Sequence, residues 1–297
     1  MTGRERGFLL LASHLGDPDR RPLTGPQLRV LGQRVRDLPV DDPEREVDAR
    51  DLLALGYGTA MAERIVNLLA EEERLDRYLS RGVRAGCVPV TRASECYPVL
   101  LRQRLGHDAP AVLWARGDLA LLNAPAVALV GSRELCAENR GFAAEVGKQA
   151  ARQGLALVSG NARGADRTAQ DACLAAGGAV ISVVADELAR HPIRENLLYL
   201  SEDGFYEPFT AQRALSRNRT IHALGWRVFV AQSGLSMGGT WDGTVKNLRA
   251  GWSEVYCFAD GSPAAAALEA MGAFPVAESD LSDFAALPMK EPSLFDR

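Results

Sequence analysis

The spacing of apolar positions along this chain changes near residue 86. Before that point, apolar residues recur at helical spacing, for example at Leu28, Leu31 and Val35, which is typical of one buried face of a helix. After it, short runs rich in β-branched residues alternate with helical stretches. The pattern predicts a small all-helical domain over residues 1–80 and a larger α/β domain over residues 86–278.

Short apolar runs in the second part predict strands, and longer periodic stretches predict helices. The strands are expected at 126–130, 155–158, 179–184, 197–200, 227–231 and 255–258, and the helices near 138–153, 165–176, 211–224, 241–250 and 262–271. Because alternating strands and helices form parallel sheets, we expect a doubly wound, mostly parallel sheet with ligand sites at the carboxyl ends of its strands. The last residues, 279–297, contain two prolines and predict a flexible tail.

Two segments of the first 80 residues break the helical pattern. Segment 39–48 is charged and contains two prolines, so it predicts a loop. Leu55-Gly56-Tyr57-Gly58 resembles a helix-hairpin-helix turn, which offers backbone N–H groups to DNA phosphates. A plain packing turn between two helices fits the same residues.

Three strand-to-helix turns combine glycine with hydroxyl side chains. Glycine lets the backbone approach a ligand closely, and the first turn of a helix offers free N–H groups and a positive partial charge. Such turns suit phosphate, although none matches the G-x-G-x-x-G or G-x-x-x-x-G-K-[ST] patterns. The candidate phosphate-binding residues are Gly131, Ser132 and Arg133 in the first turn, Ser159, Gly160, Gly164 and Asp166 in the second, and Gly238, Gly239 and Thr240 in the third.

An arginine cluster on the predicted helix 211–224 adds positive charge. Arg213 and Arg217 lie one turn apart and share a face, with Asn218 and Arg219 beside them. Arginine forms planar, bidentate contacts to phosphate. We therefore add these four residues to the candidate phosphate-binding set, although a solvated basic face would have the same sequence.

Charge is unevenly distributed along the chain, although the formal net charge is −4. Residues 86–253 carry 18 Lys and Arg against 15 Asp and Glu, whereas residues 254–297 carry 8 acidic residues against 2 basic ones. Nearly all the basic residues are arginines, which favours a nucleic-acid backbone as partner. A genome rich in G and C would produce the same bias.

No sequence signal indicates a metal, a cofactor or a membrane span. The five cysteines and four histidines are scattered, with neither a C-x-x-C pair nor metal-ligand spacing. The apolar run near the start, 8–12, is too short for a signal peptide or a transmembrane helix. We expect a cytoplasmic protein with no bound cofactor.

Six short motifs follow one another in a fixed order. They are Tyr97-Pro98 with Leu100, Val112-Leu113 with Arg116-Gly117, Val130-Gly131-Ser132-Arg133, Ser159-Gly160-x-Ala162-x-Gly164-x-Asp166, Ser201-Glu202 and Arg217-Asn218-Arg219. On these motifs, the span 97–278 resembles the DNA-processing protein A (Smf) family. The resemblance implies an extended Rossmann-like domain that binds and protects single-stranded DNA. It also implies a homodimer that helps load the RecA recombinase during recombination or natural transformation, without catalysis. The helical start resembles that family's small N-terminal domain.

Two positions depart from that family's pattern. Residues 185–192 lack the usual glycine-rich turn, and the Gly238-Gly239-Thr240 turn is closer to cytokinin-activating phosphoribohydrolase-like proteins. A nucleotide-binding sensor or phosphoribohydrolase-like enzyme is therefore the alternative function. In that alternative, Asp166 or Glu202 would act as a general base or bind a ribose hydroxyl.

Three further expectations concern partners. Phe205, Tyr206 and Phe209 either stack on DNA bases or pack in the core. The apolar stretch 264–271 either forms a dimer surface or packs on its own sheet. Ser293-Leu294-Phe295 resembles part of a short motif that docks on the bacterial sliding clamp, a three-residue match that chance also explains.

Overall fold

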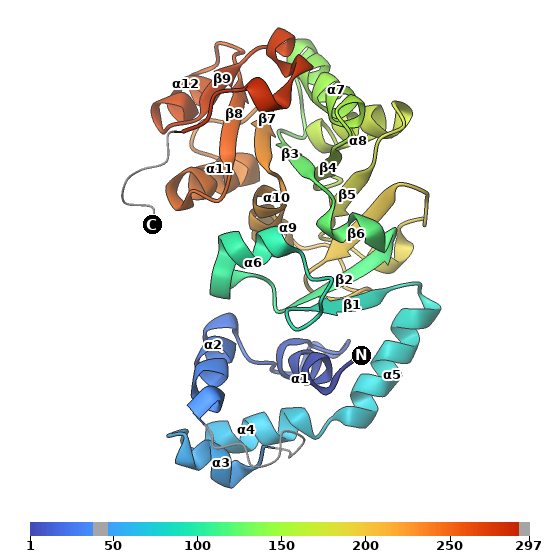
Figure 1. Ribbon diagram of the computed structural model, residues 1–297, viewed down its shortest axis with the longest axis vertical. Helices are drawn as coiled ribbons and strands as arrows, with labels where there is room; N and C mark the ends of the chain where they lie inside the picture. Colours follow the sequence, from blue (N-terminus) through green and yellow to red (C-terminus); the bar gives the residue numbers. More distant parts are fainter. Residues whose placement is uncertain (38–46, 291–297) are drawn as a thin grey trace.

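The computed structural model describes residues 1–37 and 47–290. Most of the predicted loop 39–48, and all of the Ser293-Leu294-Phe295 motif, lie outside these residues. The described chain forms a nine-stranded sheet with helices on both faces and an N-terminal helical lobe at one end (Figure 1).

The sheet is doubly wound and mostly parallel, as predicted. Its strands are β1 Val88–Thr91, β2 Val112–Gly117, β3 Ala126–Val130, β4 Ala156–Ser159, β5 Val180–Val183, β6 Leu197–Ser201, β7 Arg227–Val230, β8 Glu254–Phe258 and β9 Phe274–Val276. Their order is β1-β2-β6-β5-β4-β3-β7-β8-β9, with β1 and β2 antiparallel at one edge and parallel pairing from β6 to β9. The chain winds one way from β3 to β6 and the other way from β7 to β9. The topological switch point therefore lies between β3 and β7, where such sheets bind ligands.

The six predicted strands begin and end within one residue of the expected positions, but β1, β2 and β9 were not predicted. Pro89 and Pro275 lie within the two edge strands β1 and β9, and proline is tolerated only at sheet edges. β2 ends in Arg116 and Gly117, which weaken the apolar signal of its buried first half. These three strands depend on pairing with neighbours more than on their own sequences.

Helices cover both faces of the sheet. They are α6 Val99–Leu105, α7 Ala137–Arg152, α8 Ala165–Ala175, α9 Ala211–Ser216, α10 Asn218–Leu224, α11 Gly238–Ala250 and α12 Pro263–Ala270, with 3-10 turns η2 Gly106–Asp108, η3 Leu119–Asn123 and η4 Leu188–Arg190. α7 and α8 bury Phe142 and Ala169 in the core of one face, and α6, α10 and α12 bury Leu101, Ile221 and Leu268 in the core of the other. Among the described residues, no helix is long and apolar enough to cross a membrane.

The predicted helix 211–224 is divided at Arg217 into α9 and α10. The Arg217 carbonyl accepts the N–H groups of both Thr220 and Ile221, at 3.0 and 3.2 Å. This tight, 3-10-like pattern separates the two short helices.

The N-terminal lobe, residues 1–37 and 47–84, contains α1 Gly3–Ala12, α2 Gly25–Arg34, η1 Val35–Asp37, α3 Ala49–Ala54, α4 Thr59–Leu69 and α5 Glu72–Arg84. Leu31, Leu52 and Ile65 form a small core of its own. In contrast, Leu10 of α1 and Tyr78 of α5 are buried in the same core as one face of the sheet. The lobe is therefore packed against the sheet as well as folded around its own core.

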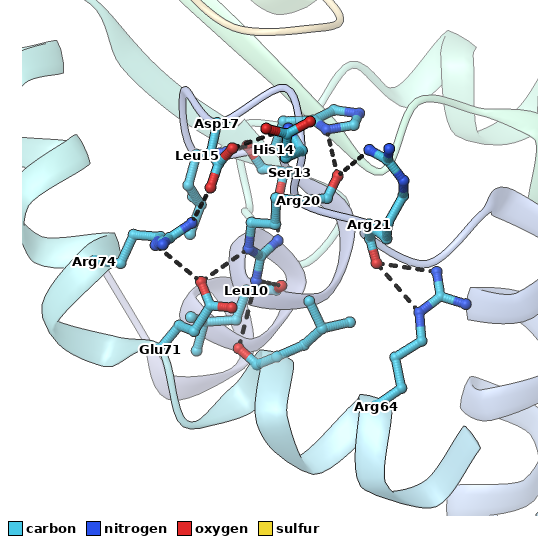
Figure 2. A network of polar contacts seen from close by, with 12 residues as sticks. Leu10, Ser13, His14, Leu15, Asp17, Arg20, Arg21, Arg64, Glu71 and Arg74 are labelled. Carbon is cyan, nitrogen blue, oxygen red and sulfur yellow. Dashed lines mark hydrogen bonds and ion pairs between the residues drawn. The ribbon is translucent and has the colours of Figure 1, made fainter. Parts of the chain in front are cut away.

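A buried guanidinium joins the helices of the N-terminal lobe. Arg20 lies in the loop after α1, its side chain is 2% exposed, and it forms an ion pair of 3.1 Å with Glu71. It also donates to the carbonyl oxygens of Leu10, Ser13 and Leu68, at the ends of α1 and α4 (Figure 2). These carbonyls have no helical partner of their own, so the single Arg20 side chain satisfies acceptors from both helices.

Replacing Arg20 with methionine is expected to lower the free energy of unfolding by about 3 kcal/mol, because buried carbonyls lose their donor and Glu71 keeps only Arg74 as a partner. Methionine keeps most of the side-chain volume, so packing changes little. Chemical denaturation measures the loss. Arg77→Gln is the matched control, since Arg77 is 71% exposed, and it should change stability by less than about 0.5 kcal/mol. An equal effect of both substitutions would contradict the role given to Arg20.

Residues 279–290 are packed, so the expectation of a flexible tail is wrong for this part of the chain. Two 3-10 turns, η5 Glu278–Ser282 and η6 Phe284–Ala286, bury Leu281 and Phe284 against the sheet. The buried Arg227 of β7 donates to the carbonyl oxygens of Ala285 and Leu287. Apolar residues every third position and an internal arginine partner outweigh the local effect of proline.

Candidate functional site

A pocket of about 540 Å³ lies at the carboxyl ends of β3, β4 and β7, at the topological switch point. We call it the strand-end pocket. Its size is ordinary for a ligand site. The predicted residues that line it are Gly131, Ser132, Arg133, Asp166, Arg217, Asn218, Gly238, Gly239 and Thr240. The three glycine-rich turns and the helix break at Arg217 therefore meet at one place.

The first two turns touch because both contain glycine where they meet. A Cβ on Gly131 would overlap the Cβ of Ala165, at the start of α8. A Cβ on Gly164, whose φ is +91°, would overlap the carbonyl oxygens of Ser132 and Arg133. The Ala165 N–H donates to the Ser132 carbonyl at 3.1 Å. These close approaches fix the Ser132 turn against the N-terminus of α8.

Arg217 lies in the wall of the strand-end pocket and is only 7% exposed. Gly160 makes room for it, because a Cβ there would overlap the guanidinium. In the described parts of the chain, Nε and Nη1 of Arg217 have no hydrogen-bond partner. Burial lowers the pKa of Arg217, while the carboxylates of Asp166, Glu202 and Asp186 raise it. Arginine stays protonated even so, which leaves a buried cation with unsatisfied donors beside the pocket.

Asp166 stabilises the second turn through a hydrogen bond to its backbone. Its side chain is buried and accepts the Ala162 N–H at 3.1 Å. Burial raises the pKa of Asp166, and the nearby Arg217 guanidinium lowers it. The carboxylate therefore holds the loop and partly compensates Arg217, in addition to lining the pocket.

The third turn is held by Asn218. Its Nδ2 donates to the carbonyl oxygen of Gly239 at 3.0 Å, and a Cβ on Gly239 would lie only 3.1 Å from that nitrogen. Gly238, with φ of +85°, begins α11, a helix of 13 residues. The first turn of α11 therefore lies at the pocket, where its free N–H groups and positive partial charge favour an anion.

Arg133 and an apolar rim complete the pocket. Arg133 is exposed, and its guanidinium lies 5.8 Å from the ring centroid of Phe209. Phe209 is 51% exposed, Leu215 49% and Met237 70%. The sequence did not single out Leu215 or Met237, because an apolar residue in a helix or loop predicts core packing unless its exposure is known. Together they place apolar surface next to positive charge.

Several predicted residues lie elsewhere. Ser159 is fully buried at the end of β4. Arg213 turns away to Glu207 and Asp203, at 3.0 and 3.2 Å. Arg219 lies 3.7 Å from Glu202 and lines two other hollows. The structure therefore does not bring Arg213 and Arg219 into the strand-end pocket.

The three candidate stacking aromatics occupy different environments. Phe205 is completely buried, stacked on Tyr78 at 4.5 Å and packed against Trp114, so of the two alternatives given for it the structure supports core packing. Tyr206 lies under Arg81 in a separate hollow. Of the three, Phe209 is the one next to a residue of the strand-end pocket, because the Arg133 guanidinium lies over its ring.

Residues of the pocket suit an anion better than a metal ion. Within residues 1–37 and 47–290, no group of three or more His, Cys, Asp and Glu side chains could hold a metal.

Glu202, the other candidate general base, accepts a hydrogen bond from Thr220 and lines the hollow between the sheet and the N-terminal lobe. Burial raises the pKa of Glu202, and Arg219 lowers it.

Comparison with known proteins gives consistent matches. The profile of the family described as DNA recombination-mediator protein A matches residues 89–250, more than half of the chain. The DNA processing protein DprA of Streptococcus pneumoniae (strain ATCC BAA-255 / R6) is 34% identical over 154 residues, 48% of this chain and 54% of that protein. DprA of Bacillus subtilis (strain 168) is 33% identical over 174 residues, 54% of this chain and 57% of that protein. The matched region thus spans about half the length of these relatives.

Solved structures agree with the sequence matches. The X-ray structure of DNA processing protein A from Streptococcus pneumoniae has a TM-score of 0.71 and 26% identity, covering 90% of this chain and 95% of that one. A structure of DNA processing protein A from Helicobacter pylori, described for its single-stranded DNA binding mode, has a TM-score of 0.53 and 22% identity. It covers 64% of this chain and 90% of that one, and at this identity it supports the fold alone.

Proposed function

This chain belongs to the DNA recombination-mediator protein A family, and we propose that it binds single-stranded DNA through phosphates in the strand-end pocket. One observation carries the proposal: the buried Arg217 guanidinium has Nε and Nη1 without partners among the described residues, beside an open pocket. A buried donor without a partner is costly, and a phosphate oxygen would satisfy it. The Helicobacter pylori protein is described by its single-stranded DNA binding mode, and such DNA offers phosphate oxygens.

Each part of the strand-end pocket has a role in this proposal. Arg133 and Arg217 supply charge, and the N–H groups of the first turn of α11 supply neutral donors. Phe209, Leu215 and Met237 offer apolar surface to the bases. Phosphate contacts and apolar base contacts do not depend on base identity, so binding should tolerate any sequence.

Two finer parts of the proposal rest on family membership alone. They are the loading of the RecA recombinase, in recombination or natural transformation, and homodimerisation. The apolar stretch 264–271, considered as a dimer surface, buries Ala264, Ala265 and Leu268 against its own sheet. The dimer therefore needs a different surface from the one that the sequence suggested.

A titration of oligothymidylates of about 4 and 20 nucleotides, spanning known single-strand site sizes, tests the proposal beside a panel of mononucleotides. The longer strand should bind more tightly, and the affinity of either should fall with salt by about 0.7 log units per log unit of salt for each phosphate contact. Arg133 and Arg217 together predict a slope of about −1.4 for the short strand. Tight mononucleotide binding that gains nothing from strand length would instead support the nucleotide-sensor alternative.

A further inference from the structure

Three hollows meet around the junction of α9 and α10. Leu215 lines both the strand-end pocket and a hollow of about 510 Å³ beside α11. Ser216 and Arg219 line that hollow and also a cleft of about 610 Å³ between the sheet and the N-terminal lobe. We call the last one the inter-lobe cleft. The three hollows are therefore neighbours that share wall residues, from the strand-end pocket to the N-terminal lobe.

Arginines from both lobes line the inter-lobe cleft. Arg21 and Arg64 come from the N-terminal lobe, Arg92 follows β1, and Arg219 comes from α10. The sequence analysis assigned no role to the first three. They lie far apart in the sequence, and only the docking of the lobe against the sheet gathers them.

Main-chain carbonyls, not carboxylates, hold three of these guanidinium groups. Arg64 donates to the carbonyl oxygens of Arg21 and Pro22, at 3.0 and 2.9 Å (Figure 2 shows the first). Arg21 donates to Pro18, and Arg92 to His107 at 3.2 Å. None of the three forms an ion pair with a carboxylate of residues 1–37 or 47–290. These hydrogen bonds hold the three side chains, and no carboxylate of the described residues compensates their positive charge.

Most acidic groups of the inter-lobe cleft are already compensated. Glu202 lies 3.7 Å from Arg219, and Asp203 lies 3.2 Å from Arg213. Asp108, at the end of η2, is exposed. Among the carboxylates that line the cleft, it is the one whose side chain forms no hydrogen bond or ion pair with the described residues. The charge of the cleft is therefore positive, with Asp108 opposing it.

We propose that the inter-lobe cleft is a second binding site for the DNA backbone, in which Arg21, Arg64, Arg92 and Arg219 bind phosphates of the same DNA strand that enters the strand-end pocket. This inference rests on the proposed function and extends it to the N-terminal lobe. The lobe then lengthens the occupied site and adds affinity that depends on strand length and salt. A short strand fills the strand-end pocket alone, whereas a long strand occupies both.

The test compares oligothymidylates of about 4 and 20 nucleotides on the full chain and on the triple variant Arg21→Gln, Arg64→Gln, Arg92→Gln. Three lost phosphate contacts should make the salt slope of the long strand shallower by about 2 and weaken its binding about tenfold at low salt. Binding of the short strand should not change. Arg77→Gln, an exposed arginine of the same lobe that lines none of the three hollows, is the matched control and should behave like the unmodified chain.

A second variant keeps the inference testable if the triple variant does not fold. Asp108→Asn removes the opposing charge without removing any hydrogen bond of the described structure, so the long strand should bind more tightly, most clearly at low salt. Unchanged binding of the long strand in the folded variants would contradict the proposal that the inter-lobe cleft is a second binding site. Equal weakening of short and long strands also overturns it, since the arginines then act on the strand-end pocket. Failure of the unmodified chain to bind either strand would overturn the proposed function itself.

Discussion

Single-stranded DNA should bind about 10- to 100-fold more weakly when Arg217 is replaced with alanine, because a hydrogen bond to a charged group contributes about 1.5–3 kcal/mol. The guanidinium is 7% exposed, so little water competes with a phosphate for it. Losing one phosphate contact should also make the salt slope shallower by about 0.7. Every base sequence should be affected alike, since phosphates carry no base information. Fluorescence titrations at several salt concentrations measure both quantities.

Arg213→Ala is the matched control for this prediction. Arg213 lies one helical turn earlier but is paired with Glu207 and Asp203 outside the strand-end pocket. Its removal should change affinity by no more than about twofold, because Arg213 does not line the pocket and two carboxylates already compensate its charge. Arg217→Lys should give an intermediate loss, because lysine keeps the charge without the planar fork. Equal losses for Arg213→Ala and Arg217→Ala would mean that general positive charge, and not the buried guanidinium, binds the strand.

The parallel part of the sheet could be predicted because its strands are buried on both faces. β3, β4 and β5 are continuous apolar runs bounded by turns, so each strand is visible in its own sequence. β1 and β9 contain proline and owe their structure to a neighbouring strand. The packed segment 279–290 depends on Arg227, about 60 residues earlier in the chain, and no local pattern reports such a contact.

The strand-end pocket was predictable for a related reason. Turns after parallel strands must meet at one edge of the sheet, so glycine and hydroxyl residues there can be assigned to one site before the structure is known. The sequence could not show in that way which arginines reach the strand-end pocket. Helical spacing places Arg213 and Arg217 on one face, and the Arg217 N–H does donate to the Arg213 carbonyl, but two acidic partners hold the Arg213 side chain away from the pocket. The inter-lobe cleft depends on how the N-terminal lobe docks, which the sequence pattern does not express.

Gly160→Ala is expected to weaken single-stranded DNA binding about as much as Arg217→Ala does. The added methyl would overlap the Arg217 guanidinium, so this group must leave its position in the pocket wall. Gly160 is not among the described residues with positive φ, so alanine adds no backbone strain of its own. Gly32→Ala is the matched control, because a Cβ there meets nothing within 4 Å. It lies within α2 and should leave binding unchanged while raising stability by up to about 1 kcal/mol.

The double variant Gly160→Ala, Arg217→Ala shows whether the two positions act through the same atoms. If Gly160 matters because it makes room for the guanidinium, the methyl has nothing to displace once Arg217 is alanine. Gly160→Ala should then lower affinity by less than about twofold in that background, and the coupling energy should approach the full effect of either single substitution. Additive losses would show that Gly160 acts through its own backbone N–H or through the loop. In that case the turn and Arg217 would contribute independently to holding the phosphate.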